Sequence, residues 1–354
     1  MCGLFSLQVP LMNATCPLPL QKYPTITLAH GGGGRLMHQL IREMFHKAFG
    51  SSPDAHDSAV LKIPQNKIAF TTDSFVVRPL FFPGGDIGSL SIHGTVNDLA
   101  MSGAEPLWLT ASFIIEEGLP METLWKIVSS MARAAESAKV KIVTGDTKVV
   151  ERGHGDGIYI NTAGVGVLHH DLHIHPHSVR AGDIILLSGD VGRHGMAVMS
   201  SRESLEFETT IQSDSAPVAA PVLDLLKAGL NLHCLRDCTR GGLITTLNEI
   251  ASSANLSFEI HESAIPIQPE VQGACEMLGL DPFYVANEGA FVIFVAEKEA
   301  KLALEILKSH IQTAQACQIG QVLEDGVAPV LIKNTLGTRR IAPVLSGEQL
   351  PRIC

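Results

Sequence analysis

The segment IAFTTD at residues 68–73 begins the pattern that decides the fold. Residues 68–72 are rich in apolar and β-branched side chains, which predicts a strand. A helical pattern follows over residues 86–101, and strand and helix patterns then alternate along the chain. Such alternation is typical of layers of helix and sheet, not of a helical bundle or a β-sandwich. The sequence therefore predicts an α+β fold in which strands and helices share each core.

The alternating pattern breaks once, at a segment of clustered histidines with Pro176, which predicts a domain boundary. The further predicted elements are strands at residues 140–144, 157–168, 183–187, 290–295 and 327–332 and helices at residues 120–138, 216–228, 242–254, 270–278 and 297–309. The predicted parts are a loose extension (1–24), a first domain (25–171), a linker (172–178), a second α/β domain (179–333) and a mobile tail (334–354).

Composition limits the class of protein. The 354 residues are 45% hydrophobic and carry a formal net charge of -10 without a concentrated Lys/Arg stripe, which argues against nucleic acid or an anionic membrane as the main partner. No stretch approaches the roughly 20 apolar residues that span a bilayer. Seven scattered cysteines do not form a secreted disulfide framework, so we expect a reducing cytoplasm.

The sequence ends in PRIC at residues 351–354. The preceding residues 345–350 mix turn-forming and polar types, which predicts a mobile arm. Ten extended residues reach roughly 33 Å, far enough to carry a group attached to the thiol of Cys354 between two sites. The alternative is a frayed end that happens to finish in cysteine.

Aspartates recur where an apolar run gives way to a turn. They are Asp57, Asp73, Asp98, Asp146 and Asp237. Any one of them is typical of a turn or a helix cap. Together in one cleft they would suit Mg²⁺, which bridges carboxylates to nucleotide phosphates, and Lys148 and Arg240 would add positive charge. The Walker and protein-kinase signatures are missing from the sequence, so a nucleotide must be bound in another way.

Two further motifs stay open. The run of glycines at residues 31–34, which contains Gly32 and Gly33, precedes a helical pattern and would suit either phosphate binding or a flexible hinge. His173, His175 and His177 alternate in the linker, where they could share a metal or be incidental surface residues.

A set of motifs spread over residues 26–354 resembles a known family. They are LAHG (28–31), DS (73–74), PLFFPGG (79–85), ND (97–98), GA (103–104), EGLPM (117–121), GDTKVV (145–150), DCTRGG (237–242), ANEG (286–289) and PRIC (351–354). The chain is similar to the HypE family of hydrogenase maturation factors. These are carbamoyl dehydratases of the PurM-like superfamily that includes aminoimidazole-ribonucleotide synthetase and selenophosphate synthetase.

The resemblance implies two α/β domains of the PurM-like type, a homodimer formed through the N-terminal sheets, and ATP held between the domains. It implies that Cys354 receives a carbamoyl group from a carbamoyltransferase, HypF. ATP then drives removal of water to leave a thiocyanate, and cyanide passes to iron on a HypC–HypD complex. Phosphorylation of the thiocarboxamide oxygen would make it a good leaving group.

Site residues follow from the same motifs. The resemblance implies that Asp57, Asp73, Asp98 and Asp237 form the Mg²⁺ and phosphate shell, with Asp146, Lys148, Gly32 and Gly33 beside it. Glu288 and His56 are both candidates for the general base. The chain departs from the family at Gly32, where a serine is common, and at His56, where the superfamily often has a second acid.

Two other functions remain as alternatives. One is a phosphotransferase or synthetase of the same superfamily that acts on a free small molecule. The other is a non-catalytic scaffold whose tail is a docking peptide held by its carboxylate.

Overall fold

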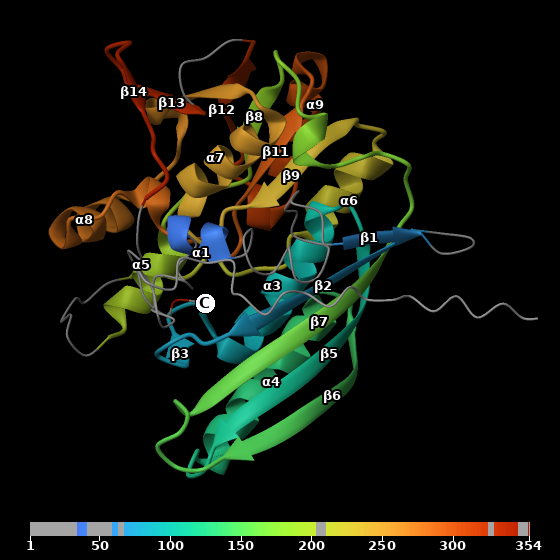
Figure 1. The fold of residues 1–354 in the computed structure, drawn as a ribbon, viewed down its shortest axis with the longest axis vertical. Coiled ribbons are helices and arrows are strands. Elements are labelled where there is room, and N and C mark those ends of the chain that lie inside the picture. Colours follow the sequence, from blue (N-terminus) through green and yellow to red (C-terminus); the bar gives the residue numbers. More distant parts are fainter. Residues whose placement is uncertain are drawn as a thin grey trace, which may run out of the picture.

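The structure, a computed structural model, describes residues 34–40, 59–62, 67–202, 210–324, 329–345 and 353. Its two domains are mixed layers of helix and sheet (Figure 1), so the predicted α+β class is confirmed. No helix among the described residues has the length and apolar character that a membrane span requires.

The first domain is built on a sheet whose described strands have the order β1-β2-β7-β5-β6. They are β1 (Ala59–Lys62), β2 (Lys67–Phe75), β7 (Ile158–Leu168), β5 (Glu105–Glu116) and β6 (Lys141–Val150). β5 and β6 are parallel, and the other neighbours are antiparallel. The parallel pair requires a crossover, which α4 (Met121–Ser137) provides.

Helix α3 (Ile87–Met101) packs on one face of this sheet, and α4 lies beside it (Figure 1). The helix begins at Asp86, whose Oδ1 accepts the N–H of Gly88 at 2.7 Å, while the Ser89 hydroxyl accepts the N–H of Asp86 at 3.1 Å. This capping box satisfies donors that the first turn leaves unpaired. Most of α3 is buried, because its other side packs against α6 (Ala219–Lys227) and β9 (Leu232–Asp237) of the second domain.

The second domain has a sheet in the order β14-β13-β10-β12-β8-β11-β9 among the described strands. They are β8 (Ile184–Leu187), β9 (Leu232–Asp237), β10 (Ser257–His261), β11 (Phe291–Val295), β12 (Cys317–Leu323), β13 (Val330–Lys333) and β14 (Arg339–Ile341). β8 and β11 are buried at every residue, as expected for strands covered on both faces. Helix α7 (Gly242–Ala254) packs on one face, and α6 and α9 (Glu297–Lys308) pack on the other.

Short elements complete the fold. They are α1 (Arg35–Leu40), α5 (Arg193–Ser200), α8 (Pro269–Leu278), the hairpin β3 (Phe81–Phe82) and β4 (Gly85–Asp86), and the 3-10 helices η3 (Pro176–Ser178), η4 (Glu262–Ala264), η5 (Pro282–Tyr284) and η6 (Ile311–Thr313). One buried cluster contains apolar side chains of α3 and α4 as well as those of α6 and α9, so the two domains share a continuous core.

Two predicted features differ from the structure. The predicted strand at residues 140–144 continues to Val150 as β6, because its pairing with β5 outweighs the low strand preference of Gly145 and Asp146. β14 lies inside the segment predicted as a tail and pairs with β13, so the second sheet extends beyond residue 333. Residues 342–345 follow it, and the Ala342 carbonyl accepts the Asn248 amide at 2.9 Å.

Candidate active site

Acidic residues from both domains converge where α3 meets the second domain. Asp73 lies near the end of β2, and Asp98 lies on α3. Asp237 ends β9, and Glu288 lies in the loop before β11. The structure thus brings Asp73, Asp237 and Glu288 within electrostatic range of one another.

Glu288 has the most perturbed environment of this group. Glu288 is only 4% exposed. Burial raises the pKa of Glu288 well above the usual range, and the carboxylates of Asp237, Asp73 and Asp214 raise this pKa further, while Arg240 opposes them. A carboxylate with a raised pKa can accept a proton near neutral pH and hold it. Such a residue is suited to general acid–base chemistry.

Asp73 and Arg240 are paired across the domain boundary. Nη2 of Arg240 lies 3.6 Å from Oδ1 of Asp73, and the same oxygen accepts the N–H of Ser74 at 2.7 Å. Burial raises the pKa of Asp73, and Arg240 and the Ser74 N–H oppose this rise. Asp98 accepts the hydroxyl of Thr71 at 2.8 Å and so lies beside the same strand.

Arg240 lies in the loop between β9 and α7, which two glycines shape. Gly241 and Gly242 have φ of 73° and 65°, in the left-handed region that favours glycine. A Cβ on Gly242 would meet the Val285 carbonyl oxygen at 2.6 Å. This loop therefore requires the glycines of the DCTRGG motif to bring Arg240 and the Glu288 loop together.

The Glu288 loop is held rigidly on both sides. The Asn287 side chain accepts the Gly192 N–H at 2.6 Å and donates to the Cys238 carbonyl at 3.0 Å. The Asp214 carboxylate accepts the N–H of Gly289 at 2.8 Å and the N–H of Glu288 at 3.2 Å. A Cβ at position 289 would lie 2.0 Å from the Asp214 carbonyl oxygen, so the ANEG motif needs its glycine there.

Asn97 ties this arrangement to α3. Its side-chain amide donates to the carbonyls of Ala216 and Glu288 at 3.0 and 3.2 Å, and its Oδ1 accepts the Val218 N–H at 2.9 Å. The Asn97 side chain therefore joins α3 of the first domain to two segments of the second domain: residues 216–218 and the Glu288 loop.

The end of the chain reaches the same region. Ile353 is 7% exposed, and its carbonyl oxygen lies 2.6 Å from Nε2 of His194 on α5. Nδ1 of His194 lies 2.8 Å from the hydroxyl of Ser213, the residue before Asp214. His194 therefore links Ile353, the residue next to Cys354, to the segment of Ser213 and Asp214 that holds the Glu288 loop.

Asp146 and Lys148 do not join the cluster within one chain, so the prediction that they lie beside Asp73 is wrong for a single chain. Both are exposed on β6, where their side chains form an ion pair at 2.7 Å. β6 is separated from β2 by β7 and β5. Three strand spacings amount to about 14 Å. The two residues therefore lie at the far edge of the sheet from Asp73.

Several predicted site residues lie outside the described residues. They are Cys354, His56, Asp57, Gly32 and Gly33. Their predicted roles stay predictions.

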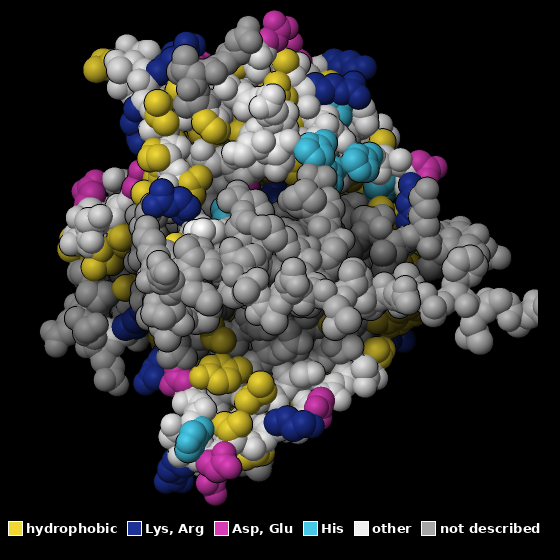
Figure 2. All heavy atoms as spheres, in the orientation of Figure 1, with side chains coloured by type: hydrophobic (Ala, Val, Ile, Leu, Met, Phe, Trp, Pro, Cys, Tyr) yellow, Lys and Arg dark blue, Asp and Glu magenta, His cyan; other side chains and the backbone are white. Residues whose placement is uncertain are grey.

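The described side chains do not form a metal site by themselves. Among those residues, no group of three or more His, Cys, Asp or Glu side chains could hold a metal ion by itself. The rings of His173, His175 and His177 are stacked, with successive centroids 5.1 and 5.0 Å apart, and so do not converge on a point. Figure 2 shows histidines gathered over the linker. The acidic cluster still fits Mg²⁺ bound through substrate phosphates, which needs only one or two protein carboxylates.

Three residues of this region were not predicted from the sequence: His194, Ser213 and Asp214. Ser213 and Asp214 belong to the polar run SDS, a pattern that any surface loop can show. In the structure these three residues are buried, because β3 and the Glu288 loop pack around them. Burial of this kind depends on tertiary contacts that one sequence does not reveal.

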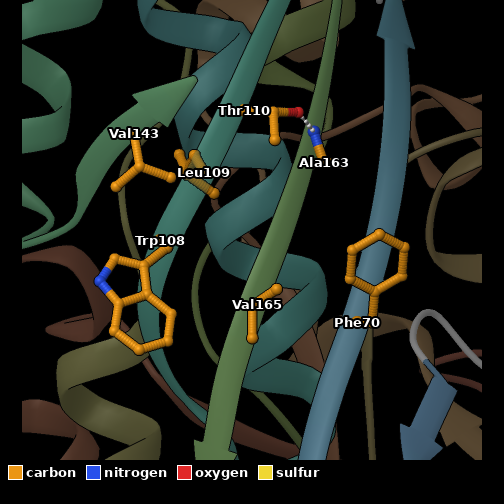
Figure 3. Close-up of a pocket in the computed structure, with 7 residues that line it drawn as sticks. All are labelled: Phe70, Trp108, Leu109, Thr110, Val143, Ala163 and Val165. Atoms are coloured by element: carbon orange, nitrogen blue, oxygen red, sulfur yellow. Dashed lines mark hydrogen bonds between the residues drawn. The ribbon is translucent and has the colours of Figure 1, made fainter. Parts of the chain in front are cut away.

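The other face of the first sheet is uncovered by any described helix. Phe70, Trp108 and Val143 are 43%, 48% and 57% exposed on it. With Leu109, Thr110, Ala163 and Val165 they line a shallow apolar pocket, in which the Ala163 N–H donates to the Thr110 hydroxyl at 3.2 Å (Figure 3). We call this surface, which carries Phe70, Trp108 and Val143, the sheet face.

Two family models match the chain. The N-terminal domain of AIR synthase related proteins matches residues 55–168, and the C-terminal domain of the same proteins matches residues 180–332. The carbamoyl dehydratase HypE of Rhizobium leguminosarum bv. viciae is 51% identical over 332 residues, which cover 93% of this chain and 95% of the relative. The HypE of Escherichia coli (strain K12) is 44% identical over 336 residues, which cover 93% of this chain and 99% of the relative.

Solved structures agree with these matches. A HypE–HypF complex contains a chain that is 48% identical, with a TM-score of 0.82 over 86% of this chain and 99% of that one. A HypE structure in complex with ATP is 43% identical, with a TM-score of 0.79 over 93% of this chain and all of that one (100%).

Proposed function

Because this chain belongs to the HypE family of carbamoyl dehydratases, we propose that it removes water from a carbamoyl group carried on Cys354. ATP is the co-substrate, and the product on the sulfur is a thiocyanate. The observation that carries this proposal is the position of Glu288. This buried base candidate lies in a loop held by Asp214, and the neighbouring Ser213 contacts the histidine that holds Ile353.

The reaction removes the oxygen from the carbamoyl carbon and turns its bond to nitrogen into a triple bond. The carbonyl oxygen of the thiocarboxamide attacks the γ-phosphorus of ATP, the bond from this phosphorus to the bridging oxygen breaks, and ADP leaves. Removal of one proton from nitrogen gives a phosphorylated imidate. Loss of the second N–H proton and cleavage of the carbon–oxygen bond then give the C≡N group, with phosphate as the leaving group. The oxygen of the carbamoyl group ends in phosphate, so one ATP is consumed for each water removed.

We assign the proton transfers from nitrogen to Glu288. Its raised pKa makes it a better proton acceptor than an ordinary carboxylate once it is ionised. Arg240, which faces both Glu288 and Asp73, supplies positive charge near the transferring phosphoryl group. His56, the other candidate base, would act on the same nitrogen. If Glu288 is the base, a Glu288 variant should be inactive; if His56 is the base, a His56 variant should be.

Mg²⁺ would be held through the ATP phosphates together with one or two carboxylates drawn from Asp73, Asp98 and Asp237, with Asp57 as a further predicted ligand. When bound, the ion would neutralise phosphate charge and orient ATP. Gly32 and Gly33 are proposed to contact the phosphates through their backbone N–H groups.

We further propose that the sheet face is the interface of a homodimer. An exposed apolar surface of this kind is unusual for a monomer and typical of a protein contact. Figure 2 shows hydrophobic side chains exposed on the lower half of the molecule, where Figure 1 shows the sheet in front of α4. A dimer formed in this way offers Lys148 and Asp146 a route to the partner's site, which they do not reach in their own chain.

The remaining partners follow from family membership. HypF, which is bound to HypE in a related complex, is proposed as the carbamoyltransferase. A HypC–HypD complex is proposed as the acceptor of cyanide, and the cytoplasm as the location.

The proposal is tested by coupling ATP consumption to the carried group. In a single turnover with Mg·ATP, the carbamoylated chain should form one ADP and one phosphate for each carbamoyl group, and Cys354→Ala treated in parallel should form none above background. Equal ADP formation by the two chains would instead favour a phosphotransferase that acts on a free small molecule.

A further inference from the structure

His194 contacts the tail, but the chemistry proposed above assigns no role to this residue. It is fully buried on α5, with Nε2 2.6 Å from the Ile353 carbonyl oxygen. Its ring meets that of Phe82 edge to face, with centroids 5.4 Å apart. The Ile353 side chain belongs to the same buried cluster as Phe82 and Met196. Both the backbone and the side chain of Ile353 are therefore held at this point.

The hydrogen bonds define the tautomer of His194. A carbonyl oxygen can only accept, so Nε2 carries the proton and donates to Ile353. In the neutral ring Nδ1 then accepts, and the Ser213 hydroxyl donates to it at 2.8 Å. The Ser213 oxygen in turn accepts the Ser215 N–H at 3.0 Å. Burial lowers the pKa of His194, with Asp214 and the Ile353 carbonyl opposing, so the neutral ring is the form that these contacts match.

The carbonyl that His194 holds is that of the peptide bond to Cys354. We propose that His194 is a positioning residue, which docks the tail by this hydrogen bond and so places the group on Cys354 for reaction. The inference rests on the proposed function, because it assumes that Cys354 carries the reacting group.

Ser213 and Asp214 connect the docked tail to the base. The Ser213 N–H donates to the Pro83 carbonyl at 2.9 Å, which fixes this segment against the hairpin of β3 and β4. The next residue, Asp214, holds the N–H groups of Glu288 and Gly289. The donor to the tail and the loop of Glu288 are therefore fixed by adjacent residues, so a docked tail has a defined position relative to the base.

The test measures docking without any need for carbamoylation. Alkylation of Cys354 by iodoacetamide is followed by mass spectrometry of the peptide 349–354 released by cleavage after Glu348. His194→Leu removes the donor, whereas His194→Gln keeps an amide N–H near the position of Nε2. Losing one buried hydrogen bond lowers the equilibrium constant for docking by about 10-fold, so the undocked fraction of a mostly docked tail rises by about the same factor. We therefore expect alkylation roughly 10-fold faster in His194→Leu, and close to the wild-type rate in His194→Gln.

A second measurement separates positioning from a structural role. In single turnover of the carbamoylated chain, His194→Leu should also lower the rate constant at saturating ATP by about 10-fold or more, because the tail that still docks lacks the hydrogen bond that orients the peptide bond to Cys354. The KM for ATP should stay unchanged. Ser213→Ala removes the partner of Nδ1 and should give a smaller shift in the same direction. It serves as the test if His194→Leu does not fold.

Unchanged alkylation in folded His194→Leu, or in Ser213→Ala when the first variant is unfolded, overturns the proposal. Faster alkylation with an unchanged turnover rate overturns the link to catalysis. If the wild-type chain docks its tail in this assay but never dehydrates a carbamoyl group, the proposed function fails while the docking contact stands.

Discussion

Asp214 allows the account to be tested quantitatively, because it is the acceptor for two buried N–H groups. Asp214→Ala leaves the N–H groups of Glu288 and Gly289 without this acceptor. An unpaired buried donor costs about 1–3 kcal/mol, so the free energy of unfolding should fall by roughly 2–6 kcal/mol. Asp214→Asn keeps one carbonyl oxygen and should lose about half as much.

The assay for this loss is urea unfolding followed by circular dichroism, with the slope m compared between variants. Asp224→Ala is the matched control, since Asp224 is 43% exposed in its ion pair with Lys227 and its loss should change stability by less than about 1 kcal/mol. Folded Asp214→Asn should also lower the pKa of Glu288, because a neighbouring negative charge is gone. The acid limb of the pH–rate profile should then move to lower pH. If the free energies of unfolding of both Asp214 variants lie within about 0.5 kcal/mol of the wild-type value, Asp214 is not the acceptor that stabilises the Glu288 loop.

The remaining predictions concern the base, the dimer and the second domain's loop. Glu288→Gln should lower single-turnover dehydration by about 10²- to 10⁴-fold. The stability of Glu288→Gln relative to the wild type should rise as pH increases from the unfolded carboxyl pKa to the raised folded pKa. In this range the carboxyl of the unfolded wild type ionises, whereas the buried carboxyl of the folded chain stays protonated, so the wild type loses stability. Urea unfolding at several pH values measures this difference. If the sheet face forms the proposed homodimer, the wild type should sediment as a dimer and Trp108→Glu as a monomer, whereas Trp125→Glu, at a residue 68% exposed on α4, should stay dimeric. If Lys148 acts in the partner's site, mixing Lys148→Ala with Glu288→Gln chains should restore about a quarter of wild-type turnover, and no recovery would place Lys148 elsewhere. Gly289→Ala should lose turnover and stability together, because its Cβ would lie 2.0 Å from the Asp214 carbonyl oxygen.

Local signals in the sequence predicted most of the described helices, but not α5 (Arg193–Ser200). Asp86 caps α3, and the predicted helix at 120–138 corresponds to α4 with its caps at Pro120 and Ala138. These signals depend on neighbours within one turn, so the sequence contains them in full. β6 was predicted too short because Gly145 and Asp146 disfavour strands, and its true length depends on pairing with β5.

For the site, too, the sequence predicts what a local motif determines and misses what tertiary contacts determine. Asp73, Asp237 and Glu288 could be predicted as neighbours because each is part of a motif of the family, and the structure brings them together. Lys148 belongs to an equally clear motif but lies across the sheet in its own chain, since a motif does not say which subunit it serves. His194 and Asp214 have roles set only by burial and by segments distant in sequence, which a single sequence does not reveal.

The proposed function requires that Cys354 carries a carbamoyl group that is dehydrated with ATP. Intact-protein mass spectrometry of the chain charged by a HypF-type carbamoyltransferase, before and after Mg·ATP, tests it most directly. We expect the wild-type chain to gain one carbamoyl group and then to lose one water. Cys354→Ala should show neither step, and Glu288→Gln should show the first step alone. A wild-type chain that acquires no adduct yet hydrolyses ATP would contradict the claim.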